Sequence, residues 1–380
     1  MAHSDRVPVD LGDRSYQVLI TDEGFDGLGT ALAERFAPGV VCVVSNPVVA
    51  PLYLAEASDS LARAGFTVRA LTIADGEQHK DAATWLALVD ALLAAGLDRR
   101  TPVIALGGGV TGDLVGFAAA AVLRGVPFVQ VPTTLLAMVD ASVGGKTGVN
   151  LPQGKNLLGA FHQPSLVFAN TRTLRSLPDA EWRCGMGEAL KHGVIRDAAL
   201  VDWMLAEASG LAAREPTLTA ELVGRCCRIK AAVVVADERE AGVRAILNFG
   251  HTFGHALETA IGYGHIRHGE AVALGMLLES RLAVRLGWCP DSAFPSQLLG
   301  IARALHLPTD LTPWADLVPG DLGAQIEAAL RMDKKTVRGT LTLVAPIAMG
   351  EVRLVTAPFS TIFSTIGRSL EMILSWENEP

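Results

Sequence analysis

The sequence predicts an α/β protein of two domains, a parallel-sheet domain over residues 1–175 and a mainly α-helical domain over residues 176–358, with a tail from 359 to 380. Three observations support this division. Short β-branched runs alternate with helical periods in the first part, which is the pattern of parallel βαβ units. Long Ala- and Leu-rich helical periods begin near Pro178. A chain of 380 residues is also too long for one small core.

The strands of the first domain are predicted from alternation and from β-branched runs. Residues 6–20 alternate, and residues 39–46 read GVVCVVSN, a run typical of a strand buried on both faces of a parallel sheet. Further strands are expected at 66–73, 102–106 and 127–134, with an amphipathic helix at 81–95 that ends at Gly96. In the second domain, helices are expected at 199–208, 218–230 and 269–283.

The composition argues against several classes of protein. Half of the residues are hydrophobic, which suits a globular interior, and the net charge of −8 argues against non-specific binding to nucleic acid. The five cysteines are odd in number and form no C-x-x-C pair, which favours a reducing cytoplasm. The N-terminus has no apolar run of signal-peptide length, and no uninterrupted apolar segment reaches the length of a membrane span. We therefore expect a soluble cytoplasmic protein without nucleic-acid or membrane partners.

A glycine pattern predicts a cofactor site in the first domain. Gly107, Gly109 and Gly112 form G-x-G-x-x-G between a predicted strand and an apolar helix. In this setting glycines let the backbone approach a pyrophosphate, and the helix N-terminus offers free N–H groups. The pattern favours a Rossmann-like dinucleotide-binding domain, and the alternative is a tight turn with close helix–strand packing. No acid follows about twenty residues later to hold the ribose, so that contact must come from elsewhere.

Histidines gather in the second domain. His251 and His255 stand four residues apart, on one face of an expected helix, and His265 and His268 follow in a short loop. A zinc-protease motif would need Glu directly after the first histidine, where this chain has Thr252. A metal site must therefore take its carboxylate from another segment, and Glu188 in the stretch CGMGEALKH is the candidate.

Several blocks resemble one family. GMGEALKHG, LNFGHTFGHALE, HGEAVALGM, DGEQHK, GGGVTGDLVGF, PTTLLAMVDASVGGKTGVN and DKK are similar to the signature blocks of the 3-dehydroquinate synthases. These enzymes are sugar phosphate cyclases, related to the iron-dependent and glycerol dehydrogenases. The resemblance spans roughly Val7 to Val355 and implies a dehydroquinate synthase-like fold, in which the helical domain binds the metal.

The resemblance implies NAD as a cofactor, with DGEQHK supplying the missing ribose contact. The residues expected to bind it are Asn46, Asp75, Gly76, Glu77, Gln78, His79, Lys80, Gly107, Gly108, Gly109, Val110, Thr111, Gly112, Asp113, Thr133, Thr134, Lys146, Lys155, Thr173, Leu174, Arg175 and Ser176.

The resemblance also implies a metal and a substrate site. Glu188, His251 and His268 would bind Zn²⁺ or Co²⁺, because one oxygen and two nitrogens suit these ions. Asp140, Lys191 and His255 would act near the reaction. Lys146, Asn156, Arg124 and Lys334 would hold a phosphate, and Lys230, Arg244 and Asn248 a carboxylate. Arg124 would reach the site of a neighbouring subunit, which implies a homodimer.

The implied reaction converts 3-deoxy-D-arabino-heptulosonate 7-phosphate to 3-dehydroquinate and phosphate in aromatic amino-acid biosynthesis. It proceeds by NAD-mediated transient oxidation, phosphate elimination, reduction and aldol cyclisation. Two alternatives stay open. One is another sugar phosphate cyclase, which makes aminodehydroquinate or a cyclitol, and the other is a metal-dependent alcohol dehydrogenase.

Overall fold

The computed structural model describes residues 4–262, 264–332, 336–337 and 339–365. It divides into two compact units. The sheet unit comprises the chain up to Leu177 together with Arg214–Arg239, and the helical unit comprises Pro178–Ala213 together with the chain from Glu240 onward. Among the described residues, no helix combines the length and the apolar character needed to cross a bilayer.

The sheet unit is built on seven strands in the order β1-β2-β9-β6-β5-β3-β4. Only the pair β1–β2 is antiparallel, and the other pairs are parallel, which confirms the predicted fold class. The strands are β1 (Ser4–Val9), β2 (Tyr16–Thr21), β3 (Val40–Ser45), β4 (Thr67–Thr72), β5 (Val103–Gly107), β6 (Phe128–Pro132) and β9 (Leu166–Asn170).

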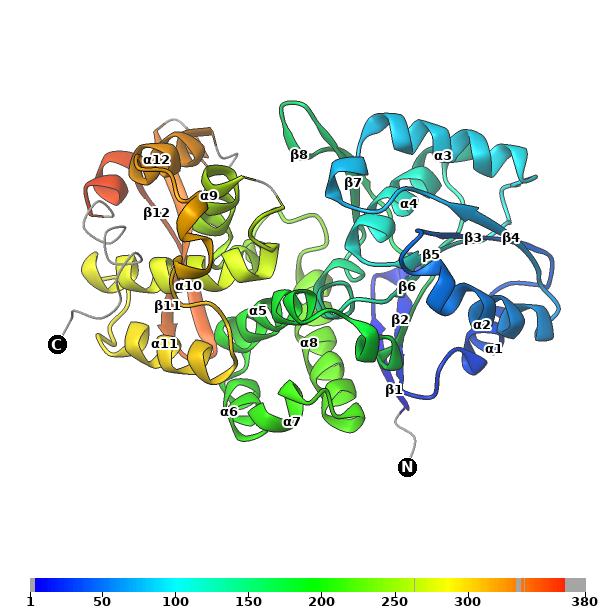
Figure 1. The fold of residues 1–380 in the computed structure, drawn as a ribbon, viewed down its shortest axis with the longest axis horizontal. Helices are drawn as coiled ribbons and strands as arrows, with labels where there is room; N and C mark the ends of the chain where they lie inside the picture. Colours follow the sequence, from blue (N-terminus) through cyan, green and yellow to red (C-terminus); the bar gives the residue numbers. More distant parts are fainter. Residues whose placement is uncertain (1–3, 263, 333–335, 338, 366–380) are drawn as a thin grey trace. The chain divides into compact units, whose positions relative to one another are not determined.

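Helices cover both faces of this sheet (Figure 1). Val41 and Val43 of β3 pack in one core with α1 (Asp26–Ala33) and α2 (Ala50–Arg63). Cys42 and Val44 of the same strand pack on the opposite face with α3 (Ala82–Ala94) and α4 (Gly109–Ala121). Burial on both faces explains why residues 39–46 read as a continuous apolar run rather than an alternating one.

The domain division differs from the single boundary predicted at residue 175. The chain leaves the sheet unit at Leu177, two residues later, but α8 (Pro216–Ala236) returns to it. This helix contacts β1 and β2, and its Arg228 pairs with Asp5 of β1. A boundary drawn once along the sequence cannot represent a helix that returns to cover the first two strands.

The helical unit contains α5 (Asp179–Arg196), α6 (Ala198–Ala206), α7 (Ala208–Ala212), α9 (His251–Ile261), α10 (His268–Arg285), α11 (Phe294–Ala304) and α12 (Leu322–Met332). It also has a small sheet that the sequence analysis did not anticipate, formed by β10 (Thr336–Val337), β11 (Thr340–Ala348) and β12 (Glu351–Pro358). Phe359 and Ile362 are buried in the same core and Phe363 packs against it, so the first residues of the predicted tail belong to this unit.

Three helices of this unit meet with their backbones in contact. A Cβ atom on Gly187 of α5 would lie 2.2 Å from the carbonyl oxygen of Gly269 in α10. A Cβ atom on Gly275 of α10 would lie 1.9 Å from the carbonyl oxygen of Gly250, which precedes α9. No side chain fits at such distances. Glycine therefore permits α5, α9 and α10 to approach closely.

Replacing Gly275 with alanine should destabilise the protein by about 1–3 kcal/mol, because the clash is with backbone that cannot rotate away. The control is Gly300→Ala in α11, where a Cβ atom meets nothing within 4 Å. That exposed helical substitution should leave stability unchanged or raise it by about 1 kcal/mol. Thermal unfolding followed by circular dichroism measures both, and equal midpoints for the two variants would contradict the packing argument.

Candidate functional site

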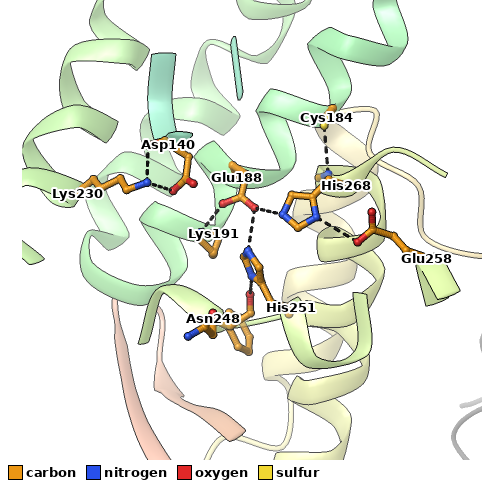
Figure 2. A network of polar contacts seen from close by, with 12 residues as sticks. Asp140, Cys184, Glu188, Lys191, Lys230, Asn248, His251, Glu258 and His268 are labelled. Carbon is orange, nitrogen blue, oxygen red and sulfur yellow. Dashed lines mark hydrogen bonds and ion pairs between the residues drawn. The ribbon is translucent and has the colours of Figure 1, made fainter. Parts of the chain in front are cut away.

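Three side chains converge within the helical unit (Figure 2). Glu188 lies in α5, while His251 and His268 are the first residues of α9 and α10. The Oε1 atom of Glu188 lies 3.5 Å from Nε2 of His251 and 3.6 Å from Nε2 of His268. The other carboxylate oxygen accepts a hydrogen bond from Lys191, one helical turn later, and both residues are buried. This ion pair leaves Oε1 facing the two rings.

The partners of the other ring nitrogens determine where the protons sit. His251 Nδ1 lies 3.2 Å from the carbonyl oxygen of Phe249, and His268 Nδ1 lies 3.3 Å from Oε2 of Glu258. Both partners can only accept, so we assign the hydrogen to Nδ1 in each ring. In neutral imidazoles each Nε2 then keeps a lone pair, and both lone pairs face Glu188 Oε1.

These residues fit a divalent metal ion. Glu188 Oε1 is buried and accepts no hydrogen bond among the described residues. Separations of 3.5 and 3.6 Å are too long for hydrogen bonds. Two ligand atoms about 2.1 Å from an ion at a tetrahedral angle, however, are separated by roughly 3.4 Å. One oxygen and two nitrogens suit Zn²⁺ or Co²⁺, and three protein ligands leave a position open for substrate.

A second group of possible ligands shares His268. Ligand atoms of His255, Glu258 and His268 also lie within 4.8 Å of one another. The ring of His255 is centred 5.5 Å from the rings of both His251 and His268, and its side chain is exposed. Glu258 is absent from the predicted set, although it follows His251 by seven residues and His255 by three. That helical spacing was the available signal.

The expected cofactor residues lie along the carboxyl edge of the large sheet. From β3 the chain continues to β4 on one side, and from β5 it continues to β6 on the other side. The strand order therefore reverses between β3 and β5. Open α/β sheets bind ligands at such a switch point. Asn46 follows β3 and donates to Thr111 Oγ1 at 3.4 Å. Thr133 follows β6 and donates its backbone N–H to the carbonyl of Gly107 at 3.0 Å.

The glycines of the motif have different surroundings. A Cβ atom on Gly112 would lie 2.6 Å from Gln130 Oε1, so this glycine lets α4 pack on β6. A Cβ atom on Gly109 would have its nearest neighbour, Ala141 Cβ, at 3.5 Å. The first N–H groups of α4, beginning with Gly109 and Val110, have no partner within the helix, which is the kind of helix end that can bind an anion. The turn thus lets α4 pack closely on β6 and leaves space beside Gly109.

The segment expected to hold the ribose joins a polar network. Lys80 is buried, and its Nζ lies 2.5 Å from Asp113 Oδ2 and 2.6 Å from Asn156 Oδ1. Glu77 Oε1 accepts a hydrogen bond from Asn150 Nδ2 at 2.8 Å. Burial raises the pKa of the Asp113 carboxyl, and Lys80 opposes that shift.

The network gives two of the expected residues structural contacts. Asn156, expected at a phosphate, ties the hairpin of β7 (Lys146–Leu151) and β8 (Gly154–Phe161) to Lys80. Glu77 is half-buried and accessible to a ligand, whereas the Lys80 ammonium faces inward. Asp75, Gln78 and His79 are exposed, and Gly76 has φ +103° at the turn.

The segment Thr173–Ser176 follows β9 at the same edge. Thr173 and Leu174 are buried, whereas Arg175 and Ser176 are exposed. Tyr53 of α2, which is absent from the predicted set, donates to the carbonyl of Thr173 at 3.1 Å and contacts Ser176 Oγ. Its phenol therefore fixes the backbone of this segment.

The described cations expected at the phosphate, and two of the residues expected at the cofactor, are exposed or half-buried. Arg124 is exposed, and with Leu123 it forms two consecutive residues with positive φ, 68° and 51°. Lys146, the first residue of β7, is exposed, whereas Lys155 and Thr134 are half-buried. Lys334 lies outside the described residues.

The residues expected at a carboxylate belong to both units. In the sheet unit, Lys230 lies 2.7 Å from Asp140 Oδ1 and also donates to the backbone carbonyl of Asp140. Asp140 stands in a π-helical turn, Ala137–Ala141, a feature common at functional sites. In the helical unit, Arg244 is 1% exposed, and Asn248 donates to Glu240 Oε1 at 2.9 Å.

Comparisons with known proteins identify a family that matches most of the chain. Residues 70–184 match the family model described as 3-dehydroquinate synthase N-terminal, and residues 185–336 match the C-terminal model. The chain is similar to 2-epi-5-epi-valiolone synthase from Streptomyces hygroscopicus subsp. jinggangensis 5008, solved with NAD⁺ and Zn²⁺ bound. That match has 30% identity and a TM-score of 0.82, and covers 95% of this chain and 98% of that one.

Two further solved structures are similar. The first is 2-deoxy-scyllo-inosose synthase complexed with carbaglucose-6-phosphate, NAD⁺ and Co²⁺, with 25% identity and a TM-score of 0.86 over 95% of this chain and 99% of that one. Glycerol dehydrogenase from Schizosaccharomyces pombe shares the fold, with 18% identity and a TM-score of 0.65 over 93% of this chain and 89% of that one.

Substitutions of the histidines should separate ligands from neighbours. His251→Ala and His268→Ala should each weaken Zn²⁺ binding by more than about 100-fold. Loss of a residue that only hydrogen-bonds to a ligand would weaken it by at most about that factor. His255→Ala should retain one equivalent of zinc. Metal content after dialysis and isothermal titration measure these effects. Loss of zinc in His255→Ala with retention in His251→Ala would show that the ion occupies the other ligand group.

Proposed function

The chain belongs to the sugar phosphate cyclases related to 3-dehydroquinate synthase, and on this premise we propose that it is itself a 3-dehydroquinate synthase. Its substrate is then 3-deoxy-D-arabino-heptulosonate 7-phosphate, and its products are 3-dehydroquinate and phosphate. The reaction is redox-neutral overall, since phosphate is lost and the carbon chain closes into a ring. It would supply aromatic amino-acid biosynthesis in the cytoplasm.

Buried Arg244 is the observation that favours this substrate. The residue lies in the short helix Val243–Asn248, seven residues before His251, and is 1% exposed. The guanidinium of arginine is a planar fork that pairs with a carboxylate through two parallel hydrogen bonds. The heptulosonate carries a carboxylate, whereas neutral sugar phosphates do not.

Lys230 gives weaker support than its sequence context indicated. Its ammonium is paired with Asp140, so Asp140 offsets part of the charge it would offer to a substrate. Lys230 is buried beside Asp140, and the pair would together orient a polar group of the substrate. The choice of an acidic substrate therefore depends chiefly on Arg244.

We propose NAD and Zn²⁺ or Co²⁺ as cofactors. When bound, NAD supplies a reversible hydride acceptor and the divalent ion supplies a Lewis acid for a substrate hydroxyl. Glu188, His251 and His268 would hold the ion, and Lys191 balances the charge of Glu188. The free N–H groups that begin α4 would bind the pyrophosphate. Exposed His255 would exchange protons with the substrate.

A second candidate is a cyclase that acts on a neutral sugar phosphate. The similarity to 2-epi-5-epi-valiolone synthase and to 2-deoxy-scyllo-inosose synthase favours it. A cyclase that makes aminodehydroquinate also fits, because its substrate keeps the carboxylate that Arg244 would pair with.

We further propose a homodimer in which exposed Arg124 reaches the neighbouring site.

Phosphate release tests the proposal directly. The purified protein, supplied with NAD and Zn²⁺, should release phosphate from the heptulosonate phosphate without accumulating NADH. A heptulose 7-phosphate that lacks the carboxylate serves as the comparison. Faster turnover of the neutral sugar would identify a cyclitol synthase, and NADH accumulation would identify a dehydrogenase.

Substitution of Arg244 tests the carboxylate contact. Arg244→Met should lower kcat/KM for the heptulosonate phosphate, because it leaves the substrate charge unpaired in the site. The loss should correspond to about 2–5 kcal/mol of transition-state stabilisation. The loss should be much smaller on the neutral sugar. Exposed Arg303→Met in α11 is the matched control and should change kcat/KM by less than about twofold. Equal losses on both substrates would show that Arg244 only stabilises the fold, which thermal unfolding checks independently.

A further inference from the structure

The two rings that face Glu188 differ in their second hydrogen-bond partner. His251 donates from Nδ1 to a neutral acceptor, the carbonyl oxygen of Phe249, at 3.2 Å. His268 donates from Nδ1 to a carboxylate, Oε2 of Glu258, at 3.3 Å. Figure 2 shows the His268 ring between Glu188 on one side and Glu258 on the other. The ring thus connects a ligand carboxylate with a second, buried carboxylate.

Glu258 occupies an unfavourable place for a charge. It is 3% exposed, and its neighbours on α9, Leu257 and Ile261, belong to the apolar core of the helical unit. A buried carboxylate costs several kcal/mol unless it is paired or hydrogen-bonded. A structural role in packing alone would be served better by an apolar side chain. Its position beside Nδ1 of His268 indicates a role that acts through that ring.

We propose that Glu258 is a positioning residue for the metal centre, which fixes the tautomer and orientation of His268 and strengthens its Nε2 as a ligand. A carboxylate that accepts the hydrogen of an imidazole increases electron density on the opposite nitrogen and locks the plane of the ring. The inference rests on the metal centre of the proposed function. It makes the two histidines unequal, with the Nε2 atom of His268 the stronger metal ligand.

The competing interpretation is a second metal ion between His255, Glu258 and His268. Glu258 Oε2 and His268 Nδ1 lie 3.3 Å apart, which fits a hydrogen bond but also fits two ligands of one ion. A second ion would, however, require His268 to lose both ring hydrogens, since its Nε2 already faces Glu188 at 3.6 Å. Metal stoichiometry separates the two interpretations.

The test uses the metal-free full-length protein titrated with Co²⁺, with no NAD or substrate present. Glu258→Gln keeps an acceptor oxygen and the size of the side chain but removes the charge, and Glu258→Leu removes both. Glu181→Gln is the matched control, because it removes a carboxylate that pairs with Arg267, next to His268, without contacting the ring. The readouts are the Co²⁺ dissociation constant, the Co²⁺ visible absorption bands and thermal unfolding of the metal-free protein.

We expect one Co²⁺ per wild-type chain, with a dissociation constant raised about 10–100-fold in Glu258→Gln and more in Glu258→Leu. The absorption bands should shift in Glu258→Gln, while its metal-free unfolding midpoint stays at or above that of the wild type. Glu181→Gln should change the dissociation constant by less than about twofold.

Each other outcome overturns the inference in a distinct way. If the wild type binds one Co²⁺ and Glu258→Gln binds it equally well with unchanged bands, Glu258 does not act through His268, and the proposed metal centre stands. Two Co²⁺ per wild-type chain, reduced to one in Glu258→Gln, would make Glu258 a ligand. No binding by the wild type would remove the metal centre of the proposed function as well.

Discussion

The contact between the backbones of α5, α9 and α10 is the constraint on which the candidate metal centre depends. Glu188 follows Gly187, His251 follows Gly250, and His268 precedes Gly269, so each ligand adjoins a glycine at a crossing point. Side chains as short as a carboxylate and an imidazole meet only if their helices approach to the van der Waals limit of the main chain. The same closeness excludes water from Glu188, which makes its ion pair with Lys191 a strong interaction.

The sheet unit obeys a different constraint, the meeting of parallel strand ends. Asn46, Gly107 and Thr133 follow or end neighbouring strands, and they are brought together by the sheet order alone. The network from Glu77 through Asn150, and from Lys80 to Asp113 and Asn156, then fixes the β7–β8 hairpin against this edge. One unit of the chain thus forms its candidate site from strand ends, and the other forms its candidate site where helices cross.

Patterns within short segments were read correctly from the sequence, and partners distant in the chain were not. The buried strand at 39–46 and the glycine turn that begins α4 each have a local signature, so the fold class followed from them. The return of α8 has none, because it depends on contacts with β1 and β2 at the start of the chain. The pairing of Lys230 with Asp140 joins residues ninety positions apart, and the inward turn of Lys80 depends on Asn156 in a hairpin. Such pairings are decided by packing, which a sequence without its fold does not specify.

The return of α8 also bears on how the protein emerges from the ribosome. Strands β1 and β2 are made first, but the helix that covers them, and Glu238, which binds Arg14 at 2.7 Å, come after the excursion from Pro178 to Ala213. The 62 residues from 178 to 239 take roughly 3–12 s to synthesise at typical rates. During that interval the apolar face of β2 awaits its cover. The sheet unit of this protein therefore cannot be completed during translation until the chain has passed through part of the helical unit and returned.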